Sequence, residues 1–474
     1  MRKCPSVFPL ACAGFGIALL LFSLIPIASL DRGGGAAVFP LLLLMAVLAM
    51  VLLARTGTSR PRLLVCLLPV GLAFFLRACL LNYVSSDYQI FLSQWVETFR
   101  AGGGFAALKE PIGNYNVPYL YILAAISYLP LPDLYLIKLF SILFDVILAW
   151  GGLRLAALFC PEGSLRPLVC FCLLLLLPTV VLNGSCWGQC DTLYGALALH
   201  ALACALGRRP GLSVFLMGIA FSFKLQTVFL LPLWGGLWLV GRVKFRHLFL
   251  FPAAYALTCI PALLLGKPLV DILSVYLGQT QEGAGSLNYN SASLFSFLPY
   301  GIQVDEALWS RLAILAALAL VLALLILLYL NRERASAPVL LTASVVLAIG
   351  VPFLLPYMHD RYFFLADVLT LAWACAVPAR FPASILVQLA SLSSYLIYLR
   401  QKFTLIIPLG DRIYPMLAEG LLMLAALLMH CSSCSVSSAP PPASRDNFPP
   451  FSPGKAVDEP ETMCYNLVTV FKNQ

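Results

Sequence analysis

Charged residues are scarce in this chain. Asp, Glu, Lys and Arg make up only 11% of its 474 residues, and 61% are hydrophobic. A soluble domain carries roughly a quarter charged residues, so the composition excludes an ordinary soluble enzyme. Apolar stretches long enough to cross a bilayer begin near residue 8 and recur along the sequence. We therefore predict an all-α polytopic membrane protein.

Motifs that would carry several other functions are also missing. There is no Walker-type glycine loop and no large cytoplasmic loop, which argues against ATP-driven transport by this chain alone. Most of the fifteen cysteines stand singly in apolar stretches, and Cys431 and Cys434 form a C-x2-C pair without a second pair, so zinc is not expected. We expect no metal and no other cofactor, because the carboxylates form no dense array. We also expect no nucleic-acid partner, because the net charge of +9 is explained by basic loops that orient the protein.

Fourteen apolar segments are interpreted as spans of a hydrocarbon layer about 30 Å thick. Two short ones meet near Lys224 and Gln226 inside the stretch 211–241. No internal repeat relates the segments, which weakens an inverted-repeat transporter interpretation. The other twelve are predicted at 7–29, 38–54, 63–82, 134–157, 166–182, 190–207, 247–265, 306–330, 338–356, 362–379, 382–399 and 413–430.

Basic residues in alternate loops orient these spans, because cytoplasmic loops carry an excess of Lys and Arg. A cytoplasmic N-terminus places two long loops outside, at about 83–133 and 266–305. The apolar stretch Val117–Leu123 in the first loop is interpreted as a helix lying in the membrane interface. The pattern fits least well near the end, where three basic residues would lie outside: Arg400, Lys402 and Arg412.

Polar residues gather in four clusters on the predicted outer face. Each has an ordinary alternative when it is read alone. Asp87 and Asp191 each precede or begin an apolar run and would suit a helix cap. Lys224 would suit a snorkelling lysine, and Asp360 a local ion pair. Their common face favours a functional surface made of Ser85–Gln89, Asn183–Asp191, Lys224–Gln226 and Met358–Tyr362.

In this order the clusters resemble motifs of GT-C superfamily glycosyltransferases that use polyprenyl-phosphate-linked sugars. Together they resemble bacterial relatives of the second mannosyltransferase of GPI-anchor synthesis and, more distantly, the dolichyl-phosphate-glucose-dependent glucosyltransferases of N-glycan assembly. Val117 interrupts the family's Tyr-Pro-Pro stretch, Cys190 replaces an aliphatic residue and Leu225 replaces a proline. The resembling segments, within about 63–380, are Ser86-Asp87-Tyr88, Asn114–Leu120, Trp187–Asp191, Phe223–Gln226 and His359–Phe363.

The resemblance implies transfer of a hexose, with mannose favoured, from a polyprenyl-phosphate donor to an extracytoplasmic glycan or glycolipid at the cell membrane. Asp87 is expected to act as the general base of an inverting displacement. The donor phosphate is assigned to His359, Arg361 and Lys224. Further substrate contacts are assigned to Tyr88, Trp187, Gln189, Asp191 and Gln226.

Several alternatives stay open at this point. A double displacement would use a second carboxylate, for which Asp191 and Glu97 are candidates. Arg77 either points at the donor or makes a structural pair. A lipid-linked glycan flippase or a secondary transporter would instead place titratable residues near the bilayer midplane, and an outer-face polysaccharide polymerase would use the same surface. Membrane lipid is an expected partner, and no protein partner is assigned.

The resemblance also divides the chain into four regions. A catalytic membrane module lies between two N-terminal helices and a final set of helices, and the proline- and serine-rich end is predicted to be a disordered cytoplasmic tail. The boundaries are 1–62 for the N-terminal helices, 63–380 for the module, 381–430 for the C-terminal helices and 431–474 for the tail.

Overall fold

The structure, a computed structural model, describes residues 7–30, 35–282 and 285–435. Each of the fourteen predicted segments contains helix within this part of the chain. Eight of the described helices are long and apolar enough to cross a membrane, or nine with a bent pair counted as one span. The chain is thus an all-α membrane protein. The eight are α1–α2 (Val7–Phe22, Leu24–Ala28), α3 (Gly35–Ala54), α4 (Arg60–Leu80), α7 (Asp133–Ala157), α13–α14 (Phe245–Leu248, Leu250–Leu264), α16 (Glu306–Leu330), α17 (Ala337–Leu354) and η8–α19 (Pro378–Arg380, Phe381–Arg400).

The bent pair corrects the prediction of one continuous span at 166–182. Helix α8 (Arg166–Leu176) ends before Pro178, and the chain bends by 45° into α9 (Pro178–Val181) and η4 (Leu182–Trp187). Proline has no N–H to donate and restricts the residue before it to extended backbone, so the helix breaks there. The bend aims the polar segment that follows Val181 into the interior.

The remaining apolar helices are shorter and include both halves of the predicted break at Lys224. Helix α11 (Pro210–Phe223) ends at Lys224, whose backbone is extended (φ −154°, ψ 135°), and η5 (Leu225–Phe229) begins directly after it. The others are α6 (Val117–Ser127), α10 (Asp191–Leu206), α12 (Leu231–Leu239), α15 (Leu269–Glu282), α18 (Phe364–Ala376) and α20 (Leu417–Ser435). Helix α20 takes in residues 431–435 of the predicted tail, and residues 436–474 lie outside the described residues.

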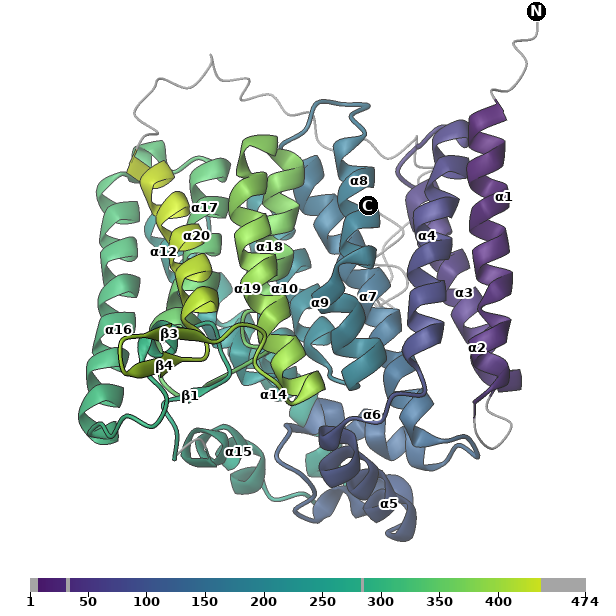
Figure 1. Ribbon diagram of the computed structural model, residues 1–474, viewed down its shortest axis with the longest axis horizontal. Coiled ribbons are helices and arrows are strands. Elements are labelled where there is room, and N and C mark those ends of the chain that lie inside the picture. The colour runs from purple at the N-terminus through teal and green to yellow at the C-terminus, as the bar shows by residue number, and fades with distance from the viewer. Residues whose placement is uncertain (1–6, 31–34, 283–284, 436–474) are drawn as a thin grey trace, which may run out of the picture. The chain divides into compact units, whose positions relative to one another are not determined.

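The first long outer loop is largely helical. It holds η2 (Tyr88–Leu92), α5 (Ser93–Ala101), η3 (Gly104–Lys109) and α6. The helix expected at Val117–Leu123 is present as α6, where Leu120 and Leu123 are buried against Val96 and Phe99 of α5. Figure 1 shows α5, α6 and α15 at one end of the long helices. This end also holds the candidate site.

Four short strands were not expected from the sequence. Strand β1 (Asn288–Tyr289) pairs in parallel with β2 (Met358–His359), and β3 (Ile407–Leu409) pairs antiparallel with β4 (Arg412–Tyr414). Strand β4 also corrects the predicted span at 413–430, since α20 begins only at Leu417. Strands of two or three residues carry no alternating pattern to predict from. The first pair matters most, because it attaches the loop after α15 to the turn between α17 and α18.

Three of the basic loops meet at the opposite end of the helices. Arg62 donates to Gly163 O over 3.1 Å, and Arg166 donates to Ala376 O over 3.2 Å. Three of the loops predicted to be cytoplasmic are therefore neighbours. Their basic residues share one end, as the predicted alternation requires.

Small residues bring two of the N-terminal helices into close contact. A Cβ added to Gly16 in α1 would lie 2.2 Å from Leu67 O, and one added to Gly71 in α4 would lie 2.2 Å from Gly16 O. Helices in lipid associate through such close backbone packing because burial from lipid gives no hydrophobic driving force. The N-terminal helices therefore pack as part of the same body as α4.

Candidate functional site

Ser85, rather than Asp87, caps the helical turn that follows it. Ser85 Oγ accepts from Tyr88 N at 3.2 Å and donates to Trp187 O at 2.6 Å. Asp87 makes no side-chain capping hydrogen bond. The capping alternative for Asp87 is therefore wrong, and its carboxylate is directed to other partners.

The Asp87 carboxylate is held by three neutral donors. Its Oδ2 accepts from Trp187 Nε1 at 2.9 Å and from Gln189 Nε2 at 2.5 Å, while Oδ1 accepts from Tyr398 Oη at 2.9 Å. The side chain retains 23% exposure. Neutral donors fix the direction of a carboxylate without removing its charge. Asp87 is thus oriented and still reachable.

A second carboxylate, Asp191, is fully engaged behind Asp87. It begins α10 but makes no capping bond. Lys224 Nζ contacts its Oδ1, and Asn183 Nδ2 donates to its Oδ2 at 2.7 Å. The side chains of Asp191 and Lys224 are 1% and 6% exposed. The capping and snorkelling alternatives are therefore wrong, because these two form a buried ion pair.

The tight turn before α10 explains why these groups meet. The π-helix η4 ends at Gly188, whose φ of 81° lies in the left-handed region that glycine adopts readily. The turn lets Gln189 N donate to Asn183 O at 2.9 Å. One short segment consequently sends Asn183 and Asp191 inward and Trp187 and Gln189 toward Asp87.

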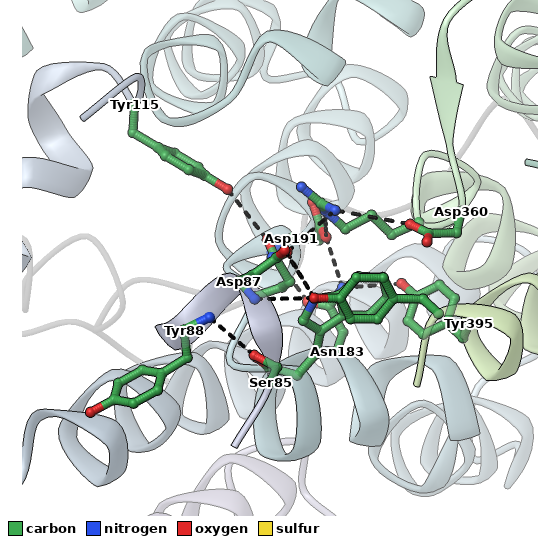
Figure 2. A network of polar contacts seen from close by, with 12 residues as sticks. Ser85, Asp87, Tyr88, Tyr115, Asn183, Asp191, Asp360 and Tyr395 are labelled. Atoms are coloured by element: carbon green, nitrogen blue, oxygen red, sulfur yellow. Dashed lines mark hydrogen bonds and ion pairs between the residues drawn. The ribbon is translucent and has the colours of Figure 1, made fainter. Parts of the chain in front are cut away.

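Arg361 lies between the two carboxylates without being saturated by either. Its NH1 is 3.8 Å from Asp87 Oδ2, and its Nε is 3.6 Å from Asp191 Oδ2. Both distances exceed a hydrogen bond. The buried Nε makes no hydrogen bond within the described residues. Figure 2 shows Asp87, Asp191 and Asp360 in this polar network. Arg361 therefore keeps donor capacity for an additional anionic group.

His359 and Asp360 directly precede Arg361, at the end of β2 and in the turn that follows it. The His359 ring stacks on Tyr289 of β1, with centroids 4.7 Å apart. Burial, reinforced by Arg361, lowers the pKa of His359 to about 4, so the imidazole is neutral at pH 7 and is not the predicted cation. Burial raises the pKa of Asp360 to about 7. Asp360 Oδ1 is 3.9 Å from Arg361 NH1, so the predicted local pair is present but loose.

One predicted substrate-binding residue, Tyr88, points away from the acid cluster, and another, Gln226, is buried. The Tyr88 side chain points away from it, as Figure 2 shows, and its hydroxyl donates to Asp133 Oδ2 at 3.1 Å. Gln226 is buried beside Lys224, and its Oε1 has no hydrogen-bond partner in the described part of the chain. Trp187, Gln189 and Asp191, by contrast, lie in the cluster itself.

The remaining charged candidates resolve into separate pairs. Glu97 pairs with Arg100 at 2.6 Å on an exposed surface. Arg77 is fully buried, with its NH2 2.8 Å from Asp145 Oδ2 and its NH1 donating to Ala73 O and Leu175 O. The structural alternative for Arg77 is therefore correct. Among the described residues, no three His, Cys, Asp or Glu side chains gather closely enough to hold a metal ion.

Sequence reasoning missed the tyrosines of the site. Tyr398 bonds Asp87, and its ring stacks on Trp187 with centroids 3.9 Å apart. Tyr395 lies one turn earlier on α19 and accepts from Asn183 Nδ2 at 3.0 Å. Tyr115 donates to Gln189 Oε1 at 3.3 Å. The sequence signal that could have identified Tyr395 and Tyr398 is their Tyr-x-x-Tyr spacing near the outer end of the predicted span 382–399. This span was not included in the predicted catalytic module, which ended at residue 380.

The sequence matches no protein-family model and no curated protein. The function is accordingly argued from the geometry of Asp87, Asp191, Lys224 and Arg361.

Proposed function

We propose that this chain is a GT-C-type glycosyltransferase that transfers a hexose, with mannose favoured, from a polyprenyl-phosphate donor to a glycan or glycolipid. In this proposal all fourteen apolar segments span the cell membrane, and the site faces outward. The observation that carries the proposal is the Asp87 carboxylate, held by three neutral donors and 3.8 Å from the guanidinium of Arg361. This proximity of a carboxylate and a guanidinium supports the pairing of a base with a cation in the proposal.

The reaction assigned to this pair is a direct displacement. Asp87 takes the proton of the acceptor hydroxyl, and the acceptor oxygen forms a bond to the anomeric carbon. The bond from that carbon to the phosphate oxygen breaks, and its electron pair stays on the departing polyprenyl phosphate. One base and one displacement invert the anomeric carbon. A cation beside the leaving oxygen stabilises the charge that develops there.

Arg361 is the group best suited to the phosphate. Its planar fork offers several donors, and its Nε makes no hydrogen bond to the part of the chain that the structure describes. Lys224 adds positive potential but is committed to Asp191. His359 is neutral at pH 7 and contributes an N–H rather than a charge. We therefore assign the main phosphate contact to Arg361 and supporting roles to Lys224 and His359.

The engagement of Asp191 argues against a double displacement. Both of its oxygens already have partners, Lys224 and Asn183, and its side chain is 1% exposed. Glu97 is exposed and paired with Arg100 on α5. A nucleophilic carboxylate must reach the anomeric carbon. Neither acid is placed for that role, which supports the assignment of Asp87 as the single base.

A transporter is the second candidate, and the buried pair Arg77–Asp145 is the observation that favours it. Asp145 lies twelve residues into α7, or about 18 Å along the helix. Titratable groups at such depth mark transport pathways in many membrane proteins. Here both side chains are 0% exposed, and Arg77 NH1 is bonded to two carbonyl oxygens. A closed pair of this kind fits helix packing better than a translocation route.

The test is sugar transfer in membranes that contain the full chain. Radiolabelled polyprenyl-phosphate-mannose and polyprenyl-phosphate-glucose are supplied separately, and label is followed into glycan and glycolipid fractions. The proposal expects transfer from at least one donor, with the anomeric configuration inverted in the product. Absence of transfer from both, together with movement of a lipid-linked glycan across the bilayer, would support the transporter instead.

A further inference from the structure

A second feature of the outer end is a cleft next to the segment that carries Asp87. It has a volume of about 350 Å³, within the usual range for small-molecule sites. One wall is formed by Val84, Tyr88 and Ser93, which flank Asp87 in the sequence. A smaller cleft of about 220 Å³ shares Arg100, Pro132 and Asp133 with it. Both clefts are lined by residues at the end of α5 and the beginning of α7.

The lining of this cleft is rich in hydrogen-bonding groups and aromatic rings. Tyr88 contributes a partly buried phenol ring, Tyr135 lies beneath the cleft surface at 2% exposure, and Asp133, Glu97 and Arg100 contribute charged groups. Burial, with Asp133 nearby, raises the pKa of Tyr88 to about 12, so its hydroxyl stays protonated and donates to Asp133. Rings and carboxylates together suit a sugar, whose C–H faces contact rings and whose hydroxyls donate to acids.

The charge of the cleft selects among sugars. Asp133 and Glu97 carry two negative charges, and Arg100 carries one positive charge that is already paired with Glu97 over 2.6 Å. A phosphate or a uronic acid would therefore meet net repulsion. A neutral, hydroxyl-rich chain would not. The cleft is thus unsuited to the donor phosphate, for which Arg361 is already available.

We infer that this cleft binds the neutral glycan portion of the acceptor, beyond the sugar whose hydroxyl faces Asp87. The inference rests on the proposed function, because the base defines where the reacting hydroxyl lies. Tyr88 directly follows Asp87, and adjacent Cα atoms are about 3.8 Å apart. The Tyr88 side chain points away from the acids, as Figure 2 shows. In this assignment an acceptor longer than one sugar extends from Asp87 past Tyr88 into the cleft.

The experiment measures the binding of sugars to the purified full chain in detergent by saturation-transfer NMR. The probes are mannose, mannotriose and mannotriose 6-phosphate. We expect mannotriose to bind more tightly than either of the others. Asp133→Asn and Glu97→Gln should each weaken mannotriose binding by about tenfold, as expected for loss of a charge-assisted hydrogen bond. Glu333→Gln is the matched control, because Glu333 is 90% exposed and lies on the opposite end of the helices.

The outcomes separate the cleft from the catalytic proposal. Equal binding of mannose and mannotriose, tighter binding of the phosphorylated probe, or equal weakening in Glu333→Gln would overturn the inference. Asp87→Asn should bind mannotriose as wild type does and transfer no sugar. If mannotriose binds as expected but Asp87→Asn still transfers, the cleft assignment stands and the base assignment fails.

Discussion

Tyr398 and Asp87 exchange two hydrogen bonds although they are 311 positions apart in the sequence. The Asp87 backbone N–H donates to Tyr398 Oη over 3.1 Å, and Tyr398 Oη donates to Asp87 Oδ1 over 2.9 Å. The first contact fixes the backbone and the second fixes the carboxylate. Helix α19 is therefore part of the site and sets the direction in which Asp87 points.

Replacing Tyr398 with phenylalanine should lower activity while leaving the fold intact. The Tyr398→Phe variant keeps the ring that stacks on Trp187 and removes both hydrogen bonds to Asp87. Hydrogen bonds to a charged group are worth about 1.5–3 kcal/mol, so we expect kcat to fall roughly 10- to 100-fold. Steady-state transfer assays measure the change. Tyr300→Phe, at a 77% exposed position, is the control and should behave as wild type.

Replacing Arg361 with lysine should weaken donor binding although the charge is kept. Lysine lacks the planar fork that can meet two phosphate oxygens at once. The KM for the polyprenyl-phosphate sugar should rise about tenfold or more, and the KM for the acceptor should change little. Arg332→Lys is the matched control, since Arg332 is 52% exposed on the opposite end. An unchanged donor KM in Arg361→Lys would contradict the assignment of Arg361 as the main contact of the donor phosphate.

Donor affinity should fall as the pH rises through about 7. Asp360, with its pKa raised to about 7, is neutral below that pH and negatively charged above it. The added charge lies beside Arg361, Asp87 and Asp191, and His359 stays neutral throughout because its pKa is about 4. The KM for the donor, measured from pH 6 to pH 8.5, should therefore increase. In Asp360→Asn this increase should be absent.

The Asp360 carboxyl should also make the folded state less stable as the pH rises. The folded-state pKa of Asp360 lies above the value of about 3.9 expected in the unfolded chain. Asp360 therefore costs stability as the pH rises from about 4 through 7, because the folded state holds a proton that the unfolded state releases. Asp360→Asn should accordingly gain thermal stability relative to wild type at pH 8 and show less gain at pH 5. A uniform shift at both pH values would contradict this assignment.

The pair Arg77–Asp145 should prove structural. Removing one partner leaves a buried, unpaired charge, a change that typically costs about 3–5 kcal/mol, so Arg77→Met should be strongly destabilised. The double variant Arg77→Met/Asp145→Leu should recover much of that loss and retain sugar transfer. Thermal unfolding in detergent and transfer assays would measure the two effects. A well-folded double variant without activity would return this pair to the functional site.

The sequence predicted the structure well where an apolar pattern is long or where a charged residue interrupts an apolar segment, which is energetically costly. Spanning segments repeat an apolar composition over about twenty residues, and Lys224 broke one such stretch where the structure breaks α11. Asp87, Asp191 and Arg361 were also singled out, because charged residues are scarce in this chain and these fall in polar clusters on the predicted outer face. Their shared end of the helices followed from the alternation of basic loops.

The parts that were missed depend on contacts between distant segments. Nothing local distinguishes Tyr398 from an interfacial aromatic anchor until α19 is placed against Trp187. The pairing of Arg77 with Asp145 joins α4 to α7 and leaves no trace in either segment alone. Burial also lowers the pKa of His359 and makes it neutral at pH 7. That burial depends on the pairing of β1 with β2, and strands of two residues have no sequence pattern from which to predict it.

The most direct test of the account is single-turnover sugar transfer by Asp87→Asn, with donor binding measured in the same preparation. Asparagine keeps the size of the side chain and one acceptor oxygen but cannot take the acceptor proton. The account predicts that polyprenyl-phosphate sugar binding persists within about threefold while the transfer step slows by at least about 10²-fold. Transfer at the wild-type rate by the folded variant would contradict the assignment of Asp87 as the base.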